Sequence, residues 1–132
     1  MTIRDDQLSK VSSLFSFSNL VEMLGEHAVG QPREIAYTFL GDGEREESHL
    51  TYSELDRQAK SLGALLQDIG AQGQRALLLY PPGSALEFIA AFFGCLYSAV
   101  IAVPIYPPGP TRLNRSLPRL MSIIDDAQPA IV

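Results

Sequence analysis

The segment from Leu77 to Pro110 constrains the fold more than any other part of this sequence. It opens with a short apolar run, turns at a Pro-Pro-Gly sequence (81–83), and continues as a long apolar stretch before a second apolar run and a proline-rich exit. A short apolar run bounded by turn residues is typical of a buried strand, and a helix that is apolar all round must be covered by several neighbours. The order therefore predicts one βαβ unit, with strands over 76–80 and 100–106 and a helix over 85–97.

This segment also has to be considered as a membrane span. The run from Phe88 to Pro110 has no charged residue and exceeds the roughly 20 residues that a bilayer-spanning helix needs. However, Gly94, Ser98 and Pro104 interrupt it, and no Lys or Arg stands close to its start. We therefore expect two buried elements, a helix and a strand, and keep the span as the less favoured alternative.

A second helix is predicted directly after Thr51, which forms a T-x-x-E capping box with Glu54. Gly70 supplies the left-handed position that ends it. Apolar residues recur at spacings of four and three on one predicted face: Leu55, Ala59, Leu62, Leu66 and Ile69. The opposite face is predicted to be solvated, with Asp56, Arg57, Lys60 and Gln67.

Weaker patterns predict the other elements. A first helix starts at a cap, Ser18 or Asn19, and ends at Gly30. Strands over 35–40 and near Leu50 are expected to form a hairpin around a charged turn. A further helix includes 117–124, with Pro118 in its first turn, and a last strand starts at Ala130.

Strands that alternate with helices predict an α/β fold of βαβ units with a largely parallel sheet and right-handed crossovers. The 132 residues and their 46% apolar content are enough for the core of one domain. A net charge of −5 excludes a nucleic-acid-binding face, because a phosphate backbone needs a basic surface. The polar N-terminus carries two Asp and resembles no secretory signal, which makes the cytoplasm the expected location.

Few residues suggest catalysis on their own. Cys95 is the single cysteine and lies in an apolar segment, so we expect a buried structural thiol. His27 and His49 are expected at the surface, and neither Asp5–Asp6 nor Asp125–Asp126 resembles an acid/base couple. The sequence predicts no catalytic, cofactor-binding or metal-binding residue in this chain.

Two proline-rich turns are the remaining candidates. The turn at Pro81-Pro82-Gly83 joins a strand to a helix, as a phosphate loop does, but it lacks a Lys and its prolines remove N–H donors. We interpret it as a rigid turn with Ser84 as the helix cap. Tyr106, Pro107 and Pro108 form either a stiff connector or a substrate-facing loop, since α/β ligands bind beyond the carboxyl ends of parallel strands.

Several stretches resemble one enzyme family in the correct order. Residues 50–55 (LTYSEL) resemble the LTYxEL signature near the start of adenylate-forming enzymes. Residues 78–83 (LLYPPG), 88–97 (FIAAFFGCLY) and 101–108 (IAVPIYPP) resemble the fatty-acyl-AMP ligases, and so do Arg119-Leu120 and Asp126-Ala127 in the next helix. The resemblance runs from about residue 15 to the end. One departure is Ala99, where the family usually has Gly.

The resemblance implies that residues 1–132 are a single N-terminal portion of an AMP-binding (adenylation) domain. Within this portion, residues 1–14 are expected to form a disordered or extended arm. The complete enzyme would use ATP and Mg²⁺ to convert a fatty acid to an acyl-adenylate, and would transfer the acyl group to an acyl carrier protein. The family's ATP loop and catalytic Lys would lie beyond Val132, so this segment alone is expected to be inactive. Because the helix over 85–97 is apolar all round and the sheet is incomplete, the segment is also expected to self-associate. Two alternatives stay open: a fragment of an acyl-CoA synthetase, and a non-catalytic α/β interaction module.

Overall fold

The structure is a computed structural model that describes residues 17–109 and 113–132. The arm predicted over 1–14 lies outside the described residues. The elements follow in the order α2 (Leu20–Gly30), β1 (Ile35–Leu40), β2 (Glu46–Thr51), α3 (Tyr52–Asp68), β3 (Arg75–Leu79), a 3-10 turn (Pro82–Ser84), α4 (Ala85–Tyr97), β4 (Ile101–Ile105) and α5 (Leu113–Ala127).

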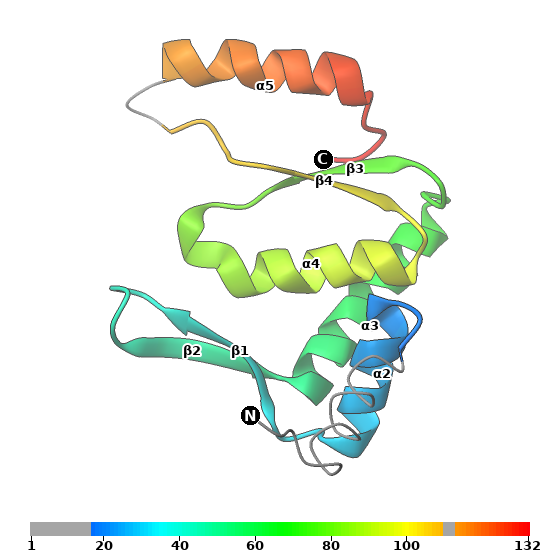
Figure 1. The fold of residues 1–132 in the computed structure, drawn as a ribbon. Helices are drawn as coiled ribbons and strands as arrows, with labels where there is room; N and C mark the ends of the chain where they lie inside the picture. The colour runs from blue at the N-terminus through cyan, green and yellow to red at the C-terminus, as the bar shows by residue number, and fades with distance from the viewer. Residues whose placement is uncertain (1–16, 110–112) are drawn as a thin grey trace, which may run out of the picture.

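The predicted βαβ unit is confirmed. β3 and β4 pair in parallel, from Arg75 opposite Ile101 to Leu79 opposite Ile105, and α4 connects them. Figure 1 shows α4 on one side of this strand pair and α5 on the other. β1 and β2 form a separate antiparallel hairpin, as predicted, so the α/β fold contains one parallel and one antiparallel pair.

Two of the three helix caps predicted from the sequence are confirmed, and the third is wrong. Asn19 caps α2 by accepting a hydrogen bond from the Glu22 N–H, and the capping box of Thr51 and Glu54 starts α3. Ser84 makes no capping hydrogen bond, so its predicted role is wrong. The 3-10 turn runs directly into α4, and this continuation replaces a side-chain cap.

Two further details of the prediction need correction. α5 begins at Leu113, so Pro118 lies inside the helix rather than in its first turn. β4 is less buried than predicted, because Ile101 is 52% exposed and Pro104 is exposed as well. Only β3 pairs with β4 among the described residues, and a proline without an N–H is typical of such an edge strand.

The core lies between α4 and its neighbours, as expected for a helix that is apolar all round. α4 contacts α3 most extensively and also touches β1, β3, β4 and α2. The crossing with α3 is close at Gly94, where an added Cβ would lie 2.8 Å from the Cβ of Leu62. Cys95 is 1% exposed in this core, which confirms the buried thiol, and burial raises the pKa of the thiol.

The last described residues lie against the free edge of β3. Ile131 forms a single parallel bridge with Ala76, and the Leu77 N–H donates to the Ile131 carbonyl over 2.8 Å. Figure 1 shows this C-terminal segment, in red, beside β3. The strand predicted from Ala130 is therefore present as one bridge.

Candidate functional site

The carboxyl ends of the two parallel strands lie side by side. β3 ends at Leu79 and β4 at Ile105, which are partners in the register. The proline-rich turn follows β3, and the segment from Tyr106 follows β4. Since ligands of α/β folds bind at this edge of a parallel sheet, it is the first candidate site.

A cavity of about 350 Å³ opens at this edge. Its wall contains three aromatic rings, Tyr80, Phe88 and Tyr106, and the rings of Tyr80 and Phe88 meet edge to face with centroids 6.1 Å apart. The remaining lining is aliphatic and includes Pro81, Pro82 and Pro104. No charged side chain of the described residues lines this cavity, so it is suited to an apolar group.

A second cavity of about 330 Å³ lies between the exit of β4 and α5. Tyr106 lines it too, together with Pro107, while Arg119 of α5 is the one charged side chain that the described residues supply to it. Pro108 lines neither cavity. Of the three residues in the predicted substrate-facing loop, the structure thus brings Tyr106 and Pro107 to cavities.

The ionisable groups near this edge give no sign of acid–base chemistry. Burial raises the pKa of Tyr80, and the charges of Cys95 and Glu87 raise it further, so its hydroxyl stays protonated at neutral pH. Among residues 17–109 and 113–132, no group of three or more His, Cys, Asp or Glu could hold a metal ion. The prolines at 81 and 82 offer no N–H to a phosphate. The turn at 81–83 therefore lacks the backbone donors of a phosphate loop.

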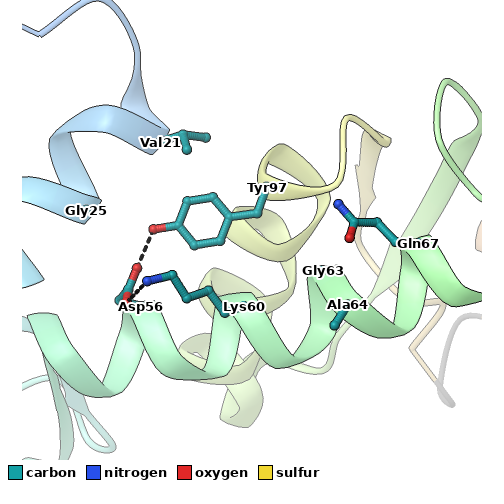
Figure 2. A pocket seen from close by; sticks show the side chains of 8 residues that line it. All are labelled: Val21, Gly25, Asp56, Lys60, Gly63, Ala64, Gln67 and Tyr97. Carbon is teal, nitrogen blue, oxygen red and sulfur yellow. Dashed lines mark hydrogen bonds and ion pairs between the residues drawn. The ribbon is translucent and has the colours of Figure 1, made fainter.

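A second candidate lies between α2, α3 and the end of α4, in a cavity of about 380 Å³. Figure 2 shows Asp56 at one end of it, with Tyr97 and Lys60 pointing toward its carboxylate. The Tyr97 hydroxyl donates to Asp56 Oδ1 over 2.6 Å, and Lys60 Nζ donates to Oδ2 over 2.6 Å. Both oxygens of this carboxylate are thus bonded.

Asp56 corrects the prediction for α3. The residue was expected on the solvated face but is only 9% exposed, because the Tyr97 side chain reaches it from the end of α4. Burial and the hydrogen bond to Asp56 raise the pKa of Tyr97, so its hydroxyl remains a donor well above neutral pH. The i, i+4 spacing of Asp56 and Lys60 was readable in the sequence. Tyr97 lies 41 residues away, and nothing in the sequence pairs it with Asp56.

The histidines line none of the three cavities described above. His49 is exposed, as predicted, and its Nδ1 lies 2.7 Å from Glu46 Oε1. His27 is half-buried, contrary to prediction, because its ring packs edge to face against Phe17 and Tyr52. No helix of the described residues is long and apolar enough to cross a membrane.

Comparison with known proteins gives consistent matches. The family described as AMP-binding enzyme matches residues 24–132. The medium-chain-fatty-acid–acyl-carrier-protein ligase JamA of Moorena producens is 48% identical over 88% of this chain, which spans 19% of that protein. A putative fatty-acid–CoA ligase, fadD25 of Mycobacterium tuberculosis, is 37% identical over 87% of this chain and 19% of its own length.

The fold also matches a solved structure. The fatty acid AMP ligase from Legionella pneumophila superimposes with a TM-score of 0.75 and 36% identity, over 97% of this chain and 20% of that one. The chain therefore spans about a fifth of the length of the relatives that it matches.

Proposed function

Because this chain belongs to the AMP-binding enzyme family, we propose that it is the N-terminal segment of a fatty-acyl-AMP ligase. The complete enzyme activates a fatty acid with ATP, releases pyrophosphate and passes the acyl group from the acyl-adenylate to an acyl carrier protein. The observation that carries the proposal is the high identity to a fatty-acid–acyl-carrier-protein ligase over most of this chain. The likeness to a solved fatty acid AMP ligase supports it.

In this proposal the segment contributes scaffold and an apolar surface rather than catalytic groups. The aromatic cavity at the carboxyl edge of β3 and β4 suits an uncharged, apolar part of a substrate. ATP and Mg²⁺ are assigned to other parts of the enzyme, where Mg²⁺ would neutralise phosphate charge. A cytoplasmic location is part of the same proposal.

The test uses a longer protein that contains residues 1–132 within a complete adenylation domain. Incubation with decanoate, ATP and Mg²⁺ is expected to release pyrophosphate and to form decanoyl-AMP, which mass spectrometry detects. Addition of a phosphopantetheinylated carrier protein should then give the acyl thioester. An absence of pyrophosphate release with fatty acids of every tested length would refute the ligase function and favour a non-catalytic interaction module.

A second candidate acceptor is coenzyme A, which the likeness to a putative fatty-acid–CoA ligase favours. The same assay with coenzyme A in place of the carrier protein separates the two. Faster thioester formation with coenzyme A would assign the chain to an acyl-CoA synthetase.

A further inference from the structure

The cavity between α2, α3 and the end of α4 has no role in the proposed ligase function. It shares no lining residue with the two cavities at the carboxyl edge of β3 and β4. Its volume of about 380 Å³ lies within the range of roughly 300–1,000 Å³ that is typical of small-molecule sites. The cavity is therefore large enough to hold a ligand of its own.

The lining of this cavity fits a flat ring. Tyr97 forms part of the wall, and Figure 2 shows its ring face on, between α2 and α3. Gly25 and Ala64 line the cavity with little or no side chain, and an added Cβ at Gly25 would meet no atom within 4 Å. Aromatic rings pack favourably in offset stacks on one another. The space beside Tyr97 therefore suits an aromatic group.

Two polar side chains of α3 in this lining keep free hydrogen-bonding capacity. The amide of Gln67 points toward Tyr97 in Figure 2, and it has no hydrogen-bond partner within residues 17–109 and 113–132. It offers both N–H donors and a carbonyl acceptor. Lys60 Nζ gives one of its three donors to Asp56 and keeps the others. A carboxamide matches this set, because it accepts through its carbonyl and donates through its N–H₂ group.

The charges of the lining favour an uncharged ligand. Asp56 and Lys60 are the charged residues that the described part of the chain supplies to this cavity, and they bind each other. Both oxygens of Asp56 are bonded, so a cationic ligand finds no unpaired anion. An anionic ligand would compete with Asp56 for Lys60. A neutral carboxamide avoids both costs.

We propose that the cavity between α2, α3 and α4 is a binding site for a small, uncharged aromatic carboxamide. The ring of the ligand stacks on Tyr97 beside Gly25. Its carbonyl accepts a hydrogen bond from Lys60, and its N–H₂ group donates to the carbonyl of Gln67. Because the ligand contacts all three helices, its binding stabilises their packing. The site lies outside the acyl-adenylate chemistry and goes beyond the proposed function.

The experiment uses the longer protein that contains residues 1–132 within a complete adenylation domain, without ATP. The probe is para-fluorobenzamide, whose binding is followed by fluorine NMR. The expected dissociation constant is about 1 mM, which is the order of magnitude for a ligand of this size. para-Fluorobenzoate has the same ring but carries a carboxylate. It should bind about ten-fold more weakly, because it has no N–H for Gln67 and competes with Asp56 for Lys60.

Two matched pairs of variants locate the probe. Gly25→Leu fills the cavity from α2 and should weaken binding by about ten-fold or more. Gly30→Leu adds the same side chain to α2 outside the lining, again with no atom within 4 Å of the added Cβ, and should leave the affinity unchanged. Gln67→Met removes the amide at an exposed position and should weaken binding by about five-fold, whereas Gln74→Met, outside the lining, should have no effect.

A dissociation constant above about 10 mM for the unmodified protein would overturn the proposal. Equal affinities for the amide and the acid would overturn it too, and so would equal affinities within either pair of variants, because the probe would then lie in another cavity. None of these measurements involves pyrophosphate release. A failure of this site therefore leaves the ligase function undecided, and a failure of the ligase function leaves the binding result valid.

Discussion

Ala99 and Gln128 are the described non-glycine residues with a positive φ, of 56° and 47°. Ala99 lies between the end of α4 and β4, and its carbonyl accepts a hydrogen bond from the Gly73 N–H over 2.9 Å. The resembling family usually has Gly at this position, and the positive φ of Ala99 is a conformation that glycine adopts at no steric cost. A Cβ in this region costs of order 1 kcal/mol.

Replacement of this residue by glycine should therefore not destabilise the chain. Ala99→Gly removes the strain but adds conformational entropy to the unfolded state, so the free energy of unfolding should rise by about 0–1 kcal/mol. Urea denaturation measures it. Ala64→Gly, at an exposed position inside α3, is the control and should lower stability by about 0.5–1 kcal/mol. A similar loss of stability in both variants would show that the backbone at Ala99 is not strained.

The hydroxyl of Tyr97 is expected to contribute to the stability of the fold. Tyr97→Phe removes the donor to the buried Asp56 and should lower the free energy of unfolding by about 1–3 kcal/mol. Tyr37→Phe is the control, because Tyr37 is 40% exposed and its hydroxyl has no hydrogen bond with the described residues. Equal stability of the two variants would mean that the Tyr97–Asp56 contact contributes nothing.

The pH dependence of the same pair follows from the raised pKa of Tyr97. A folded-state pKa above the unfolded value of about 10 contributes stability that is fully present below pH 10. This contribution is lost as the pH rises through the folded-state pKa. Comparison of thermal denaturation from pH 8 to 11 should therefore show the difference between the native chain and Tyr97→Phe undiminished up to at least pH 10. A difference that disappears below pH 9 would contradict the assignment.

At the scale of elements, two glycines inside helices have opposite surroundings. Gly25 lies within α2 beside the cavity of Figure 2, and an added Cβ there would meet no atom within 4 Å. Gly94 lies at the crossing of α4 and α3, where an added Cβ would also lie 3.2 Å from the Ala59 carbonyl oxygen. The packing would thus accept a side chain at Gly25, whereas at Gly94 it requires a glycine.

Alanine substitutions should separate these two roles. Gly25→Ala should stabilise the chain by about 1 kcal/mol, which is the difference in helix propensity. Gly94→Ala should destabilise it by about 1–3 kcal/mol despite the same gain in propensity, because α3 and α4 must move apart. Urea midpoints of the two single variants provide the measurement. Stabilisation by Gly94→Ala would show that the crossing is looser than described.

At the scale of the whole molecule, the proposed function assigns the contacts to nucleotide phosphates to parts of the enzyme outside residues 1–132. The isolated chain of residues 1–132 should therefore neither bind ATP appreciably nor form acyl-AMP. Isothermal titration calorimetry with ATP and Mg²⁺ should give no measurable heat of binding. A dissociation constant in the low micromolar range would contradict this prediction and place a phosphate site within these residues.

The isolated chain should also self-associate, which stays a prediction. α4 itself is covered, but α5 leaves Leu117 and Met121 exposed by 43% and 49% on its amphipathic surface. Light scattering should show dimers or larger species, and Leu117→Glu with Met121→Glu should convert them to monomers. A native chain that stays monomeric at high concentration would refute the prediction.

The sequence by itself determined the elements and their order. Local signals, such as the capping box at Thr51, the glycine at position 70 and the alternation of apolar runs with turns, act over a few residues and were sufficient to predict α3, α4 and the βαβ unit. The resemblance to the fatty-acyl-AMP ligases rested on the same contiguous stretches. These features could be predicted from the sequence because they depend on residues that are close to one another along the chain.

Only the tertiary structure decided which polar groups are buried and where space remains. Asp56 has the sequence context of a solvated helix face, and its burial follows from the crossing of α4, which also brings Tyr97 to it from 41 residues away. The same holds for the cavities at Tyr106 and Pro107, since each lies between elements that are separated in the sequence. Helix crossings and sheet edges are set by packing over the whole chain, which no local pattern encodes.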